Sequence, residues 1–85
     1  MTEQIKLEEF SISQLNNISG NHDENLKLIE DTFGISITLR GDELLLTGDN
    51  ATNFDKAKKV IQTIIDLVRN KITITLPHIA YALQL

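Results

Sequence analysis

Residues 35–40 and 43–48 are two short runs rich in β-branched residues and leucine, and only Gly41 and Asp42 separate them. A two-residue connection of this kind joins neighbouring antiparallel strands, and its glycine readily takes the positive φ that such turns need. We therefore expect a β-hairpin here, and the remaining elements have to be arranged around it.

The chain before the hairpin begins with an alternating segment and a short helix. Residues 5–10 alternate apolar and charged side chains with the period of a half-buried strand. Residues 13–19 place their apolar side chains on one helical face. Ser13 is the expected N-cap of this helix, and Gly20 is expected to end it.

A second helix is expected almost immediately afterwards. It should start near Asn21 or Asp23, because Asn21 and Glu24 have the spacing of a capping box. Gly34 should end it. Its apolar stripe has the three- and four-residue spacing of a buried helical face and comprises Leu26, Ile29 and Phe33.

The longest helix is expected over residues 50–70, with Asn50 or Thr52 as its N-cap. Its main apolar residues step by three and four, as packing on a sheet requires. They are Phe54, Ala57, Ile61, Ile64 and Val68. Val60, Ile65 and Leu67 widen this face beyond what a surface helix needs, so we expect a second layer of contact on it.

Residues 72–85 are expected to form a short strand over residues 72–74 and a final helix. Thr75 is a natural N-cap, and Pro77 suits the first turn. The helix ends on apolar residues without a glycine or a polar tail. We therefore expect the chain to be part of a longer protein.

The charge and composition of the chain exclude several classes of site. Twelve acidic residues against eight lysines and arginines give a net charge of -4, so a polyanion would need a local basic patch. Without cysteine there is no disulfide or thiolate metal site, and His22 and His78 have no third ligand at metal spacing. No catalytic constellation recurs, so we expect no enzyme in this segment. No apolar run approaches a membrane span and no signal peptide begins the chain, so we expect a cytoplasmic protein.

The order of the expected elements, βααββα, is that of a type I KH domain, a single-stranded nucleic-acid module whose GxxG loop contacts phosphates. The expected fold class is therefore α+β, with a three-stranded antiparallel sheet packed against helices. The KH-like domain should span residues 1–71, and residues 72–85 a C-terminal extension. Gly20 would begin the loop, but Asp23 stands at its second glycine, where bulk and like charge oppose a phosphate.

A closer resemblance covers most of the chain. The sequence contains a G-x-x-D-x-x-L-K-x-I-E motif and an I-x-x-R-G-[ND]-x-[IL]-x-[IL]-x-G hairpin. These motifs resemble the N-terminal region of PhoH-like proteins, cytoplasmic bacterial P-loop ATPases related to superfamily-one helicases. The matching residues are Gly20, Asp23, Leu26, Lys27, Ile29, Glu30, Arg40, Gly41, Asp42 and Gly48. Asp23 thus matches this family's own form of the loop.

The resemblance implies an accessory domain of an ATPase whose core is absent from this chain. No G-x-x-x-x-G-K-[ST] motif occurs, so ATP and magnesium are implied for the parent protein and no cofactor is expected here. The implied partners are single-stranded RNA, the parent's ATPase domain and a second copy of the chain. RNA would bind weakly between the second helix and the strand at residues 36–40, on Gly20, Asn21, His22, Asp23, Lys27 and Arg40.

Two interpretations stay open for these residues. Residues 20–23 could contact RNA or merely start a helix, with Asp23 placed favourably against the helix dipole. Lys27 could supply positive charge for a phosphate or pair with Asp23 or Asp31. Arg40 could reach a phosphate or stack on a base, or it could pair with Asp42 or Glu43. The alternative function is a protein-interaction or oligomerisation domain of KH shape without the nucleic-acid clamp, which the acidic charge and the broad apolar face of the longest helix favour.

Overall fold

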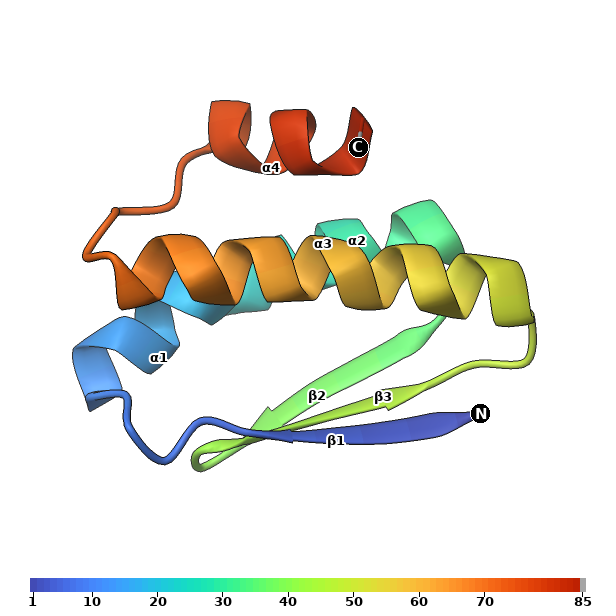
Figure 1. Cartoon of the computed structure of the whole chain (residues 1–85), viewed down its shortest axis with the longest axis horizontal. Coiled ribbons are helices and arrows are strands. Elements are labelled where there is room, and N and C mark those ends of the chain that lie inside the picture. Colours follow the sequence, from blue (N-terminus) through green and yellow to red (C-terminus); the bar gives the residue numbers. More distant parts are fainter. Residues whose placement is uncertain (85) are drawn as a thin grey trace.

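The computed structural model describes residues 1–84 and shows a three-stranded antiparallel sheet with helices on one of its faces (Figure 1). The fold class is α+β. In chain order the elements are β1 (Thr2–Lys6), α1 (Ile12–Ser19), the 3₁₀ turn η1 (Asn21–Asp23), α2 (Glu24–Phe33), β2 (Ser36–Arg40), β3 (Glu43–Thr47), α3 (Ala51–Arg69) and α4 (Leu76–Gln84). No helix among these residues is long and apolar enough to cross a membrane.

The predicted hairpin is confirmed and forms the middle of the fold. β3 lies at the centre of the sheet and pairs antiparallel with β1 and β2. Arg40 is opposite Glu43 across the two-residue turn, and Gly41 has φ +60°. Alternate residues of each strand therefore face the helices, among them Ile37 on β2 and Leu44 on β3, both of which are buried.

The first strand was predicted too late in the chain. β1 spans Thr2–Lys6, and Lys6 pairs with Glu43, the first residue of β3. Beyond that pair β1 has no partner strand, so the chain bends, and the Phe10 N–H donates to the Leu7 carbonyl at 3.1 Å. The apolar alternation of residues 5–10 continued past the end of the pairing, which is why it misplaced the strand.

The N-cap of α1 is Ser11, so the prediction of Ser13 was wrong. The Ser11 Oγ accepts from the Gln14 N–H at 3.1 Å, and the Ser11 N–H donates to the Gln14 Oε1 at 2.9 Å. This reciprocal pair is a capping box, and Gln14 completes it only for the serine three residues earlier. Gly20 ends α1 as predicted.

The helices form two further layers above the sheet. α1, α2 and α3 lie over one face of the sheet, and α4 packs on the other side of α3 (Figure 1). Most apolar residues of α3 are almost fully buried: Phe54, Ala57, Val60, Ile61, Ile64, Ile65 and Val68. Leu67 is only partly buried. The second layer of contact expected for this helix is therefore α4, which buries Ile79 and Ala82.

Residues 72–74 do not form the predicted strand. The Ile72 carbonyl accepts from the Asn17 Nδ2 at 2.9 Å, and the Ile74 N–H donates to the Asn17 Oδ1 at 2.8 Å. The backbone of this segment thus bonds to a side chain of α1 in place of a neighbouring strand. Its alternating sequence suits a strand, but its position beside α1 offers no strand to pair with (Figure 1).

Replacing Asn17 by alanine should lower the free energy of unfolding by about 1–2 kcal/mol, because a backbone carbonyl and an N–H lose their partner together. Denaturant unfolding followed by circular dichroism measures the loss. Asn16→Ala is the matched control, since Asn16 is exposed, and it should change stability by less than about 0.5 kcal/mol. Equal effects of the two substitutions would contradict the role given to Asn17.

Candidate nucleic-acid interface

The loop between α1 and α2 has an uncommon backbone. Gly20 has φ +80°, and His22 and Asp23 have φ +53° and +59°, in the left-handed region that residues with a side chain rarely adopt. The turn is closed by the Asp23 N–H, which donates to the Gly20 carbonyl at 3.2 Å. Two successive left-handed residues in an exposed loop are a sign of a functional constraint.

The capping box predicted between Asn21 and Glu24 is absent. The chain passes through η1 before α2 begins at Glu24, so Asn21 lies too early to cap the helix. Asp23 occupies the N-cap position, but its side chain makes no capping hydrogen bond. The first turn of α2 therefore has no carboxylate cap.

Gly20 is required by the close approach of α2. A Cβ at this position would lie 2.8 Å from the Asn25 Cγ and 2.9 Å from the Glu24 Cγ. Asn25 is buried, and its Nδ2 donates to the carbonyls of Asn17 and Ile18, both at 3.3 Å. Asn25 therefore provides hydrogen-bond donors for the last backbone carbonyls of α1. In the sequence the only sign of this role is a polar residue beside the apolar stripe of α2.

Gly20→Ala should destabilise the fold by about 3 kcal/mol, because it adds a steric clash to the cost of a positive φ. Gly34→Ala is the matched control: Gly34 has φ +67°, but a Cβ there would meet nothing within 4 Å. Its cost should be about 1 kcal/mol. Thermal or denaturant unfolding compares them, and equal losses would show that the approach of Asn25 does not constrain the loop.

A groove of about 660 Å³ lies between α1 and the turn of the hairpin, and we call it the α1–hairpin groove. Its apolar lining is Phe10, Ile12, Leu15 and Leu39, and its other lining residues are Asn16, Ser19, Asp23, Gly41 and Asp42. Ile12 is 79% exposed, which is unusual for a large aliphatic side chain. Among the described residues that line it there are two carboxylates and no lysine or arginine.

The six predicted site residues do not converge on one hollow. Asp23 alone among them lines the α1–hairpin groove. Between α2 and β2, where a groove was expected, the Ile37 N–H donates to the Glu30 carboxylate at 2.7 Å. Lys27 is exposed on α2, and Arg40 alternates with the buried residues of β2, which places it on the outer face of the sheet.

Neither Lys27 nor Arg40 forms an ion pair with any residue in the range 1–84. The pairings considered for them, with Asp23 or Asp31 and with Asp42 or Glu43, are thus not formed. Arg40 instead lines a shallow hollow of about 300 Å³ with Thr38, Glu43 and Leu45. His22 is exposed and lies in the loop between the two helices.

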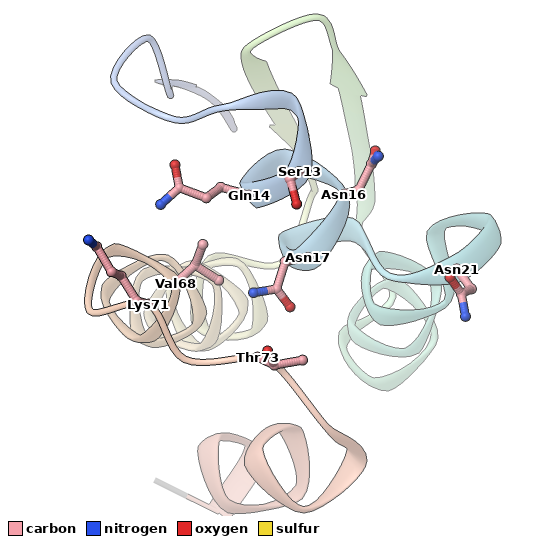
Figure 2. Close-up of a pocket in the computed structure, with 8 residues that line it drawn as sticks. All are labelled: Ser13, Gln14, Asn16, Asn17, Asn21, Val68, Lys71 and Thr73. Carbon is pink, nitrogen blue, oxygen red and sulfur yellow. The ribbon is translucent and has the colours of Figure 1, made fainter.

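Another hollow, which we call the amide cleft, has a volume of about 460 Å³. It is lined by Ser13, Gln14, Asn16, Asn17, Asn21, Val68, Lys71 and Thr73 (Figure 2). In Figure 2 the side chains of Gln14 and Lys71 extend from the side of the cleft away from Asn21. A smaller hollow of about 210 Å³ continues from Asn21 and Gly20 towards Thr73 and Ile74.

Arg69 holds one wall of the α1–hairpin groove in place. Its guanidinium lies 5.5 Å from the centre of the Phe10 ring and pairs with Glu9 at 3.1 Å and Asp66 at 2.9 Å. A hydrogen bond with its own backbone, and then the bond with Arg69, lower the pKa of the Glu9 carboxyl below its ordinary value. Glu9 is exposed, so these contacts orient residues 7–10 more than they stabilise the fold.

No group of three histidines, cysteines or acidic residues within the described part of the chain could hold a metal ion. No protein-family model matches the chain, and no curated protein matches it.

Proposed function

We propose that the chain is a KH-like accessory domain of a PhoH-like ATPase, and that it binds single-stranded RNA for a catalytic core outside the chain. The KH-like part is residues 1–71, and residues 72–85 are the extension towards that core. ATP, magnesium and a cytoplasmic setting belong to the proposal through the family motifs alone.

The arrangement of the elements supports the KH-like assignment. Two helices joined by a glycine loop stand between β1 and β2, and β3 lies between these strands in the sheet. The loop, α1 and the hairpin turn border one open groove. KH modules hold single strands beside the loop that joins such a pair of helices.

The observation that carries the proposal is the chemistry of the α1–hairpin groove. Ile12, Leu15 and Leu39 offer apolar surface to the faces of unstacked bases. Asp23 and Asp42 repel phosphates but can accept hydrogen bonds from base amino groups. A single strand would therefore lie with its bases in the groove and its backbone outside, where Lys27 is free of ion pairs within residues 1–84.

A second candidate function is the docking of a basic peptide in the same groove. Two carboxylates beside apolar walls suit a cationic partner, and the net charge of -4 adds to the attraction. The broad apolar face of α3 no longer favours this candidate, because α4 of the same chain covers it. RNA remains the first proposal because the groove adjoins the glycine loop.

Backbone amide shifts of the 85-residue chain, titrated with single-stranded RNA of mixed sequence in low and moderate salt, test the proposal. We expect shifts along α1 and at the hairpin turn that weaken as salt rises. Ile12→Glu should lower the affinity roughly tenfold or more, because it adds a charge to the apolar wall.

Leu76→Glu is the matched control, since Leu76 is 68% exposed on α4 and the charge change is the same. It should leave RNA binding unchanged. Absence of shifts around the groove, or equal effects of the two variants, would contradict RNA binding there. Amide shifts around the groove that saturate with an oligolysine peptide but do not occur with RNA would favour the second candidate. Light scattering of the same sample tests self-association.

A further inference from the structure

We propose that the amide cleft binds a phosphate of the nucleic-acid backbone, with Lys71 as its cation. The inference rests on the proposed function, because it supplies the phosphate contact that Asp23 removes from the glycine loop. The cleft lies against α1, as does the α1–hairpin groove, and Asn16 lines both hollows. A strand with bases in the groove can therefore bring its backbone to the cleft.

The charges that line the two hollows are opposite. The described residues around the amide cleft include Lys71 and no aspartate or glutamate, although the chain as a whole is acidic. Lys71 forms no ion pair with any residue between 1 and 84. An anion that enters this cleft thus meets an uncompensated positive charge, whereas one that enters the groove meets Asp23 and Asp42.

Neutral hydrogen-bond donors accompany Lys71 in the cleft. The Gln14 side chain uses its Oε1 to accept from Ser11, and its Nε2 has no partner in the described chain. The hydroxyl of Ser13 is likewise free of side-chain hydrogen bonds within residues 1–84. The amide of Asn21 lies at the opposite end of the cleft from Lys71 (Figure 2). Ser13 and Gln14 also belong to the first turn of α1, where the helix dipole favours an anion.

The backbone around Lys71 fixes the lysine at the cleft. Its φ is +64°, its N–H donates to the Val68 carbonyl at 2.9 Å, and the Ile72 N–H donates to the Leu67 carbonyl at 3.0 Å. Helices that end in this way usually place glycine at the left-handed position, because a side chain there is strained. A lysine kept at that position indicates a use for its side chain.

Asn17 holds the following residues against α1. Its side-chain amide bonds to Ile72 and Ile74 on the far side of Thr73, which also lines the cleft. The two walls of the cleft, from α1 and from the segment after α3, are therefore connected directly. A phosphate bound between them would need little rearrangement of the backbone.

The test compares Lys71→Gln with Lys56→Gln in the 85-residue chain, using single-stranded RNA across a range of salt. Lys56 lies on α3, about 20 Å along its axis from Arg69, the last residue of the helix that Lys71 follows. Lys71→Gln should weaken binding roughly three- to tenfold in low salt and reduce the slope of log affinity against log salt by about 0.7. Lys56→Gln should change neither.

Lys71→Gly separates binding from folding. Glycine takes the left-handed backbone without strain, so the melting temperature should not fall, while the affinity should drop as it does for Lys71→Gln. Equal affinities and slopes for Lys71→Gln, Lys56→Gln and wild type would overturn the inference. In that case RNA binding that is still sensitive to Ile12→Glu would leave the proposed function intact.

Inorganic pyrophosphate is a second ligand for the test, one that has phosphates but no bases. It should shift the amides of Ser13, Gln14 and Lys71 in the wild type and not in Lys71→Gln, and RNA should shift the same amides. If pyrophosphate moves them and RNA does not, the cleft is a site for free anions and its assignment to the nucleic-acid backbone is overturned. Absence of any RNA binding rejects the inference together with the proposed function.

Discussion

The apolar side chains of α3 are buried by two neighbours at once, and the other elements are arranged around that helix. The sheet lies on one side of it and α4 on the other, and α1 and α2 pack beside it (Figure 1). Ile61, Ile64 and Ile65 are each about 1% exposed or less, and each buried side chain of this size contributes roughly 2 kcal/mol. In a chain of 85 residues such burial is a large part of what makes a stable core possible.

The charges around α1 then explain how an acidic domain could serve a polyanion. A basic surface attracts the whole nucleic acid, but here the carboxylates lie where bases would enter and a lysine lies where a phosphate would. Such a separation sets the orientation of a strand more than it raises the affinity. It fits a domain that presents RNA to another active site.

Local patterns predicted most of the fold, and long-range contacts account for the errors. The hairpin and α3 follow from turn chemistry and helical periodicity, both of which are properties of neighbouring residues. The strand expected at residues 72–74 failed because Asn17, more than fifty positions earlier, provides its hydrogen-bond partner. The serine that caps α1 was missed because both candidates are serines. They differ in the residue three positions later, which is Gln14 for Ser11 and Asn16 for Ser13.

The candidate site was less predictable than the fold. Motif residues marked the glycine loop, but the groove beside α1 is formed by residues from three separate parts of the chain, before and within α1, at Asp23, and around the hairpin turn. Lys71 carried no signal in the sequence, because the role proposed for it depends on a helix end that places it in the same cleft as Gln14. Arg40 matches the family motif, yet the alternation along β2 turns it to the outer face of the sheet.

The link between Asn17 and the segment after α3 also has a mechanical consequence. α4 is joined to α3 through residues 70–75, and the two hydrogen bonds of Asn17 lie at the middle of this connection. A pull that separated α4 from α3 would therefore act on α1, the helix between the two hollows, through these bonds. In the longer protein that we propose, tension on α4 would thus act on the surface proposed to hold RNA.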